Sequence, residues 1–254
     1  MDPLVKTRTD APPQFFEAEA AGLRWLAAAG GARIVGVRDV SPGRIVLERI
    51  AATRADVGAA ASFGAALAAT HDAGAPAFGA KPEGWDGPVF IGRLEQPCRP
   101  AASWGSFYAE QRVRPFLARA VDAGNLDGDD VALVERACDV IASGAFDDDD
   151  APARIHGDLW NGNVLWSPDG AVLIDPAAHG GHRETDLAML DLFGCPYLDV
   201  IVRAYDQAHR LRPGWRERTP VHRLHPLAVH AVGHGPSYGA ALRDAAARTL
   251  ALTR

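Results

Sequence analysis

The stretch Arg154–Asp175 constrains this chain more than any other; it reads Arg-Ile-His-Gly-Asp-Leu-Trp-Asn-Gly-Asn-Val-Leu-Trp-Ser-Pro-Asp-Gly-Ala-Val-Leu-Ile-Asp. Two short apolar runs flank Ser-Pro-Asp-Gly, which predicts a hairpin whose last loop residue, Gly170, has a positive φ. With Asp169 at the centre of the turn, Asn163 faces Asp175. Directly opposed Cβ atoms lie roughly 4.5–5.5 Å apart. The amide oxygen and the carboxylate can therefore hold one hard cation such as Mg²⁺.

A third polar residue, Asp158, precedes Asn163 in a loop that begins at His156. The pattern H-G-D-x-x-x-x-N, followed by an Asp at a strand end, has the order of a kinase catalytic loop and its metal-binding Asp. In that chemistry the first Asp orients the attacking hydroxyl and accepts its proton, and the Asn and second Asp hold Mg²⁺ on the nucleotide phosphates. The alternative is an Asx-rich loop that caps a hairpin.

The N-terminal segment predicts a strand that ends at Lys6 and a helix that begins near 11–14 and stops at Gly30-Gly31. Phe16, Ala20, Leu23 and Ala27 lie on one stripe of this helix, and Glu19 lies beside the stripe. A strand Lys and a helical Glu form the ion pair that orients the α- and β-phosphates in kinases. The alternative is an unpaired surface Lys and Glu.

Two further strands are predicted at 33–40 and 44–50, joined by a Ser-Pro-Gly turn. In a two-lobed kinase the second strand leads into the hinge between the lobes. The backbone of Glu48, Arg49 and Ile50 is then expected to pair with adenine. An ordinary hairpin is equally consistent with these residues.

The remaining chain reads as mainly helical. Helices are predicted at 57–71, 104–123, 131–143, 197–210, 220–232 and 237–252, with Pro115 kinking or dividing the second of these. His71 is expected at a helix end or in the core. The Gly- and Pro-rich stretch 74–103 is expected to form an ordered excursion that can wall a substrate site.

Several acidic and histidine residues allow competing interpretations. Asp186 can brace the catalytic loop by accepting its backbone N–H groups, or it can cap the following helix. The acidic run 147–150 is expected to be a solvated loop rather than a metal site. The histidines of the C-terminal half show no H-E-x-x-H motif, and His222-x-x-His225 lies beside Pro220 and Pro226, an awkward platform for a helical ligand pair, which argues against zinc. The P-loop motif G-x-x-x-x-G-K-[ST] does not occur.

Composition narrows the class of protein. A formal net charge of −6 argues against a nucleic-acid partner. Three scattered cysteines, at positions 98, 138 and 195, fit free thiols in a reducing cytoplasm. The N-terminus lacks the apolar segment of a signal peptide. The sequence contains no run of 18 apolar residues, so it predicts no membrane span. Oligomeric state is not readable from the sequence.

Four segments closely resemble the fructosamine kinase family over nearly the whole chain. They are Phe-Phe-Glu-Ala-Glu-Ala-Ala-Gly-Leu (15–23), Ala-Glu-Gln-Arg-Val-Arg-Pro (109–115), His-Gly-Asp-Leu-Trp-Asn-Gly-Asn (156–163) and Ile-Asp-Pro-Ala-Ala-His-Gly-Gly-His-Arg-Glu-Thr-Asp-Leu-Ala (174–188). The H-G-D-L-W-x-G-N element is the most family-specific of them. The resemblance implies an α+β, protein-kinase-like fold of two lobes, related to aminoglycoside phosphotransferases. We expect a small β-rich N-lobe at 1–50 and a mainly helical C-lobe at 51–254.

The resemblance also implies a reaction and its site. The reaction is ATP- and Mg²⁺-dependent phosphorylation of the 3-hydroxyl of a ketosamine, either a small molecule or a glycated protein lysine, as a step of deglycation repair. Asp158 is then the base, Asn163 and Asp175 bind Mg²⁺, and Lys6 with Glu19 orients the phosphates. Trp160 is expected to form a flat wall for the sugar amine, with a core tryptophan as the alternative. His156 is a further expected substrate contact.

Two departures from the family pattern qualify these expectations. Asn161 stands where the family usually has Ser. The chain also begins at the expected third N-lobe strand, so the hairpin whose glycine-rich turn covers the ATP phosphates is expected to be missing. The missing hairpin favours one alternative to a ketosamine kinase, a nucleotide-binding pseudokinase. The other alternative is a kinase of another small alcohol or an aminoglycoside-like substrate.

Overall fold

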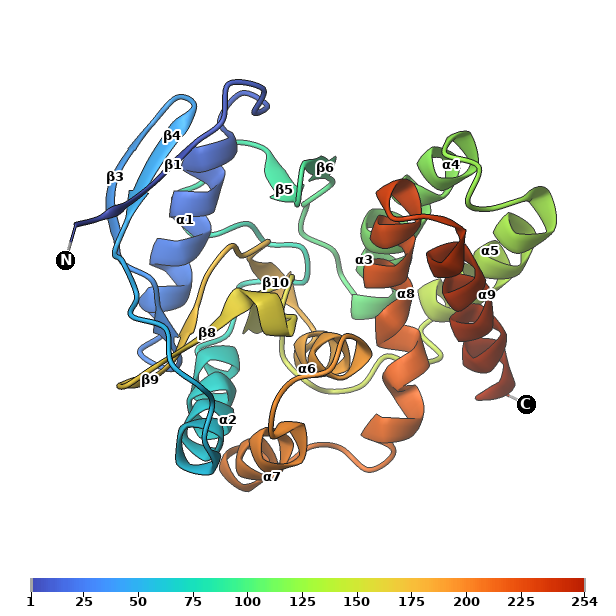
Figure 1. The fold of residues 1–254 in the computed structure, drawn as a ribbon. Helices are drawn as coiled ribbons and strands as arrows, with labels where there is room; N and C mark the ends of the chain where they lie inside the picture. Colours follow the sequence, from blue (N-terminus) through green and yellow to red (C-terminus); the bar gives the residue numbers. More distant parts are fainter. Residues whose placement is uncertain (1, 254) are drawn as a thin grey trace.

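A computed structural model describes residues 2–253 and shows a mixed α and β chain with two contrasting ends (Figure 1). At one end a three-stranded antiparallel sheet lies beside α1 (Phe15–Ala27). Its strands, in the order β1-β4-β3, are β1 (Leu4–Thr7), β4 (Arg44–Leu47) and β3 (Val37–Ser41). At the other end the chain is helical. This is the two-lobed arrangement that the sequence predicted.

Helix α1 forms where its apolar stripe predicted it. Phe16, Ala20 and Leu23 are buried, whereas Ala27 is exposed because the helix ends there. The hairpin β3–β4 closes over Pro42 and Gly43, and Gly43 has a φ of 74°, which favours glycine. The helix and the hairpin thus follow directly from local sequence.

The predicted strand at 33–40 is instead two strands in different sheets. β2 (Arg33–Ile34) pairs in parallel with β9 (Gly170–Leu173), and β3 begins only at Val37. Between them, Gly36 leaves the ladder: its carbonyl accepts the backbone N–H of Glu48 at 2.7 Å, and its own N–H donates to the Glu48 carboxylate at 3.3 Å. The sheet β2-β9-β8 therefore joins the N-terminal residues 33–34 to the hairpin within the stretch Arg154–Asp175.

The catalytic hairpin has a different register from the predicted one. β8 (Val164–Ser167) pairs with β9 so that Ser167 lies opposite Gly170, and the loop has two residues rather than three. The Ser167 hydroxyl donates to the Gly170 carbonyl at 2.8 Å and accepts the Asp169 N–H at 3.3 Å, which stabilises the tighter turn. As a result, the backbone of Asn163 accepts a hydrogen bond from Ile174, not Asp175.

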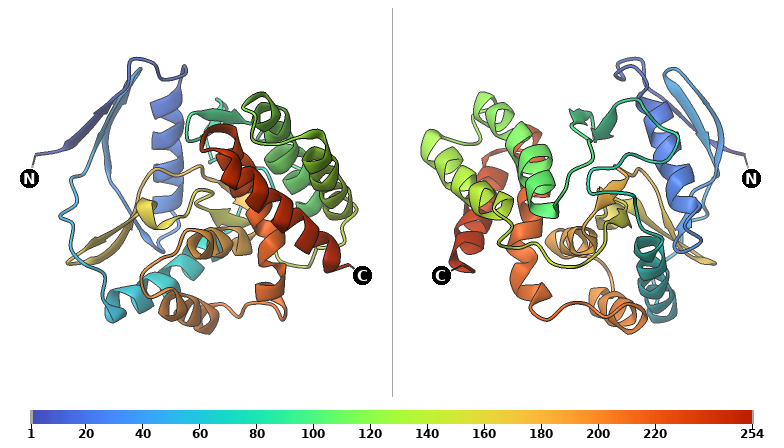
Figure 2. Two further views of the ribbon diagram at one scale, coloured as in Figure 1. Left: turned by 45° about the vertical axis from the view of Figure 1, so that its right-hand side comes forward. Right: turned by 180° about the vertical axis from the view of Figure 1, so that it is seen from behind.

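Nine α-helices are described in residues 2–253, and the last eight follow residue 50. These are α2 (Val57–Asp72), α3 (Trp104–Tyr108), α4 (Arg114–Asp122), α5 (Gly128–Ala142), α6 (Arg183–Leu192), α7 (Leu198–Ala208), α8 (Trp215–Gly233) and α9 (Pro236–Ala251). A π-helical turn at Ala109–Val113 separates α3 from α4, which confirms the predicted division near Pro115. Helices α2 and α7 lie side by side, as do α8 and α9 (Figure 2).

The stretch 74–103 is an ordered excursion that carries the short hairpin β5 (Val89–Ile91) and β6 (Leu94–Gln96). Figure 1 shows it between α1 and the C-terminal helices. Strand β7 (Ala153–Ile155) directly precedes the catalytic loop, and strand β10 (His179–Gly181) follows the β8–β9 hairpin. The two strands pair antiparallel with each other.

Two apolar cores support these elements. The first joins α1 and the N-terminal strands to α2, β8, β9 and α7, and the second lies among α3, α4, α5, α8 and α9. The first core crosses residue 50, so the predicted division into 1–50 and 51–254 does not coincide with a gap between cores and stays a prediction. Within residues 2–253, none of the helices combines the length and apolar character needed to cross a bilayer.

Candidate active site

One cavity of about 600 Å³ is lined by residues of β1 and α1, of the excursion 74–103 and of the stretch from Asp158 to Ala178. Six of the predicted site residues line it: Lys6, Glu19, Asp158, Trp160, Asn163 and Asp175. They come from β1, α1, the catalytic loop and the end of the β8–β9 hairpin. The fold therefore brings together residues that lie far apart in the sequence.

The catalytic loop depends on one glycine and one amide. Gly157 has a φ of 78°, and a Cβ there would lie 2.4 Å from the carbonyl oxygen of Ala177. The Asn163 amide donates to the backbone carbonyl of Asp158 at 2.7 Å and to its carboxylate at 3.1 Å. These hydrogen bonds hold the two ends of the loop, Asp158 and Asn163, together and orient the Asp158 carboxylate toward the cavity.

Asp158 has the electrostatic character of a proton acceptor. Burial raises the pKa of this carboxyl to about 7, and the nearby charges of Asp175 and Asp186 act in the same direction, while the Asn163 hydrogen bond opposes them. A carboxylate whose pKa lies near neutral pH is a stronger base than an ordinary Asp.

Asp175 follows β9 in a left-handed conformation with a φ of 53°. Asp tolerates this region better than most residues. The turn carries its carboxylate into the cavity, next to Asn163, although the predicted cross-strand pairing of these two residues was wrong. The backbone carbonyl of Asp175 lies 3.5 Å from the Asn163 amide nitrogen.

Lys6 pairs with two acids at once. Its Nζ lies 2.9 Å from Glu19 Oε1 and also contacts Asp175 Oδ1. Burial lowers the pKa of the Lys6 ammonium, but attraction to Glu19 and Asp175 outweighs it and leaves that pKa raised. The ammonium is therefore charged at neutral pH, and the alternative of an unpaired surface lysine is wrong.

Asp186 braces the catalytic loop. Its carboxylate accepts the backbone N–H groups of His156 at 2.7 Å and Gly157 at 2.9 Å. Helix α6 is instead capped by His182, so the capping alternative for Asp186 is wrong. His71, a core residue as expected, lies 3.1 Å from the same carboxylate.

The hydrogen bonds of His71 fix its tautomer. Burial lowers the pKa of the His71 ring, so it is neutral. A carboxylate only accepts, so Nε2–H donates to Asp186, and Nδ1 accepts from the hydroxyl of Tyr205 at 2.8 Å. The buried Asp186 carboxylate thus accepts three hydrogen bonds, from His71, His156 and Gly157.

The structure does not bring His156 into the cavity. This residue is buried, its Nε2 donates to the Ile174 carbonyl at 2.9 Å, and its Nδ1 accepts the Asp158 N–H at 3.2 Å. The ring is therefore fully used in tying the catalytic loop to the end of β9. We withdraw the expectation that His156 contacts substrate.

The expected hinge residues also lie outside this cavity. The Glu48 side chain pairs with Arg33 at 2.7 Å, and Arg49 donates to the backbone carbonyls of Asp2 and Pro3. Neither they nor Ile50 lines the cavity. A role for their backbone in adenine binding stays a prediction.

Trp160 is 42 % exposed and lines the cavity, so the core alternative for this residue is wrong. Further lining residues that the sequence did not single out are Arg8, Phe15, Trp85, Phe90 and Arg93. Only the composition of 74–103 pointed toward three of them, because no local motif distinguishes a lining aromatic or arginine from an ordinary surface residue.

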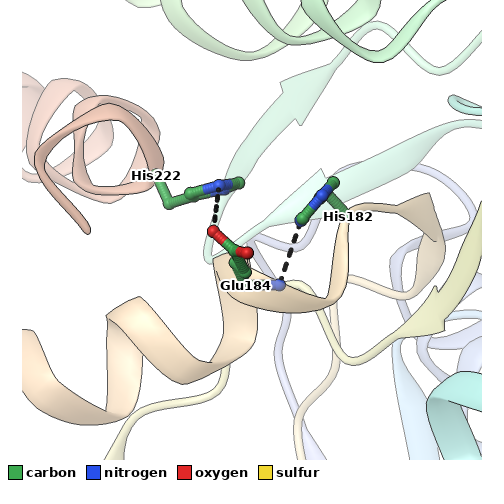
Figure 3. A group of neighbouring side chains, drawn as sticks. All are labelled: His182, Glu184 and His222. Atoms are coloured by element: carbon green, nitrogen blue, oxygen red, sulfur yellow. Dashed lines mark hydrogen bonds and ion pairs between the residues drawn. The ribbon is translucent and has the colours of Figure 1, made fainter. Parts of the chain in front are cut away.

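A histidine and glutamate cluster lies beside the site but is not part of the cavity. Ligand atoms of His182, Glu184 and His222 lie within 4.8 Å of one another (Figure 3). Glu184 is already paired with Arg218, and it accepts the Nε2–H of His222 at 3.3 Å. His182 accepts the Glu184 N–H. The three side chains therefore already belong to a buried network of hydrogen bonds and ion pairs, and we propose no metal there.

The acidic run 147–150 lies at the surface as expected, with Asp147, Asp148 and Asp149 exposed and Asp150 half-buried, although two of its side chains also form ion pairs. Asp148 and Asp150 keep 18 % and 15 % of their side chains exposed, and both pair with Arg212. Asp150 also lies 3.4 Å from Arg183 in α6. The run connects the segment before the catalytic loop to α6 and to the residues before α8.

Comparison with known proteins agrees with this geometry. The fructosamine kinase family model matches residues 2–251. An Enterococcus faecium protein named "Probable ketoamine kinase" is 30 % identical over 244 residues, which cover 93 % of this chain and 83 % of that protein.

Solved structures give the same family and fold. A Thermobifida fusca structure, described as a "putative fructosamine-3-kinase", superimposes with a TM-score of 0.90 at 47 % identity and covers 97 % of this chain and 85 % of that one. An aminoglycoside phosphotransferase structure superimposes with a TM-score of 0.55 at 16 % identity, over 93 % of this chain and 83 % of the other, which shows the fold alone. The fold is protein-kinase-like, the protein is a kinase, and the chain belongs to the fructosamine kinase family.

Proposed function

We propose that this protein transfers the γ-phosphoryl group of ATP to the 3-hydroxyl of a ketosamine, the adduct of a sugar and an amine. The observation that carries the proposal is the position of Trp160, an exposed indole that lines the same cavity as Asp158. An indole face packs on the C–H surface of a sugar and attracts a cationic amine. A ketosamine offers both features next to the reacting hydroxyl.

The chain's own residues supply the acid–base chemistry. Asp158 accepts the proton of the 3-hydroxyl as that oxygen forms its bond to the γ-phosphorus. The bond from phosphorus to the bridging oxygen breaks, and ADP leaves. Asn163 holds the Asp158 carboxylate in place through its 3.1 Å hydrogen bond, and Lys6 supplies positive charge for the phosphates.

The donor set fits a magnesium ion. The Asn163 amide nitrogen is used for hydrogen bonds to Asp158, which leaves its oxygen as a ligand atom, and the Asp175 carboxylate is 43 % exposed in the cavity. Oxygen atoms of this kind suit Mg²⁺, which also retains phosphate and water ligands. When bound, Mg²⁺ would neutralise charge on the nucleotide phosphates.

The expected consequence is repair of glycated amines, since the family's 3-phosphate product is unstable and releases the amine. The substrate is a free ketosamine or a glycated lysine of a protein. The three cysteines are all free, which fits the reducing cytoplasm that the sequence predicted.

The test is Mg²⁺-dependent ADP release with fructosyl-lysine, ribulosyl-lysine and a fructosyl-lysine peptide, compared with lysine plus free fructose. We expect release only with the ketosamines, and a phosphorus NMR signal from a sugar 3-phosphate. Turnover of choline or an aminoglycoside instead would establish another alcohol kinase. Binding of ATP without turnover of any acceptor would establish a pseudokinase.

A further inference from the structure

The excursion 74–103 places a second tryptophan against the cavity. Trp85 lines the cavity that also holds Asp158 and Trp160, although it comes from a segment with no catalytic motif. Its side chain is half-buried. The neighbouring Phe90 packs against Phe15 at the start of α1, with ring centroids 5.4 Å apart, which ties the excursion to the N-terminal part.

The Trp85 ring is held in one position. Its Nε1–H donates to the Pro88 carbonyl at 2.8 Å, and the ring lies on Gly87, where a Cβ would be 2.4 Å from Cζ2. Lys81 donates to the carbonyls of Asp86 and Gly87 at 2.9 and 2.6 Å, which fixes the turn beneath the ring. The indole is therefore a rigid surface.

Trp160 repeats this arrangement on the catalytic loop. Its ring lies on Gly162, where a Cβ would be 2.2 Å from Cη2. Trp85-Asp86-Gly87 and Trp160-Asn161-Gly162 are thus two Trp-x-Gly units, each with its indole over the glycine two residues later. Both indoles line one cavity. Rigid aromatic surfaces bind without a large loss of side-chain entropy.

We propose that Trp85 forms the second wall of the acceptor site and is a specificity-determining residue. The acceptor lies between two indoles, so the site selects a carbohydrate that carries an alkylammonium group over small alcohols that cannot contact both walls. Trp160 contacts the part of the acceptor near the reacting hydroxyl, and Trp85 contacts the remaining part. This inference rests on the proposed ketosamine kinase function.

The most direct test is a variant that displaces the Trp85 ring without removing it. Gly87→Ala displaces the Trp85 ring, while the Gly87 backbone is not in the left-handed region and accepts alanine. We expect the KM for fructosyl-lysine to rise about 3- to 10-fold, and the KM for ATP to change less than about 2-fold. Trp85→Phe should keep part of the affinity, and Trp85→Leu should show the full effect.

Gly128→Ala is the matched control, because a Cβ at Gly128 meets nothing within 4 Å and Gly128 does not line the cavity. It should leave both KM values unchanged. Calorimetric titration with fructosyl-lysine alone should give the same loss of affinity as the kinetics. Melting temperatures near the parent value show that the variants are folded.

The outcomes separate the two proposals. Unchanged acceptor KM and Kd in Trp85→Leu, with an active parent, overturn this inference and leave the proposed function intact. A rise in the KM for ATP instead of the acceptor assigns Trp85 to the nucleotide and also overturns it. A folded parent that neither binds nor phosphorylates a ketosamine overturns both.

Discussion

The carboxylate of Asp186 accepts a hydrogen bond of 2.7 Å from the backbone N–H of His156, at the first residue of the catalytic loop. A second bond from Gly157 and a third from His71 complete its partners in the interior. Because no side chain of the loop itself supplies these acceptors, the position of Asp158 depends on a residue of α6.

Removing this brace should destabilise the protein and slow the reaction. Asp186→Ala leaves two backbone N–H groups and the His71 N–H without their buried acceptor, so we expect the free energy of unfolding to fall by about 2–4 kcal/mol. Denaturant unfolding measures it. The control Asp191→Ala removes a surface pair with Arg223 and should cost less than about 1 kcal/mol. Equal losses in the two variants would contradict the brace.

Asp158→Ala should slow phosphoryl transfer strongly and leave nucleotide binding in place. General-base catalysis contributes about 10²- to 10⁴-fold, so kcat should fall by that factor. Calorimetry should show Mg·ATP affinity close to that of the parent, because Lys6, Asn163 and Asp175 remain. Turnover at the parent rate would remove Asp158 from its proposed role.

Lys6→Met should weaken ATP binding. The ammonium contributes charge-assisted hydrogen bonds to the phosphates, and losing about 1.4 kcal/mol or more raises the KM for ATP at least about tenfold. Glu19→Gln should have a smaller effect in the same direction, since it weakens the ion pair that orients Lys6 but leaves the ammonium itself in place. Arg44→Met, which breaks an exposed pair with Asp39, is the control and should leave the KM for ATP unaltered.

Stability should fall in mild acid because of His222. Burial lowers the pKa of this ring to about 4, with the Glu184 hydrogen bond opposing the shift. As pH falls below about 6.5, the unfolded chain binds a proton that the folded chain does not. The contribution of the neutral ring is therefore complete above pH 6.5 and is lost progressively down to about pH 4.

Urea unfolding at pH values from 7.5 to 4 measures this loss. His222→Gln keeps a donor and an acceptor but cannot titrate, so its free energy of unfolding should fall less steeply over the same range. Parallel curves for the variant and the parent would show that other groups cause the acid sensitivity.

The sequence alone determined the features that depend on neighbouring residues. The apolar stripe of α1, the turn at Gly43, the division near Pro115 and the order of Asp158, Asn163 and Asp175 are all local patterns, and the structure contains each of them. The family followed from the same motifs, because a catalytic loop keeps its residues at fixed spacing along the chain.

Only the tertiary structure decided which side chains face the cavity. The sequence placed His156 at the substrate, but packing turns its ring into the interior. It paired Asn163 with Asp175 across a hairpin whose register a serine hydrogen bond shifts by one residue. It marked 74–103 as a possible wall of the substrate site but did not identify Trp85 as the residue that lines the cavity. His156 and Trp85 reach their positions through packing between segments that lie far apart in the sequence, and local patterns carry no record of such contacts. The hairpin register depends instead on a side-chain hydrogen bond within the turn, which the pattern of apolar and turn residues does not specify.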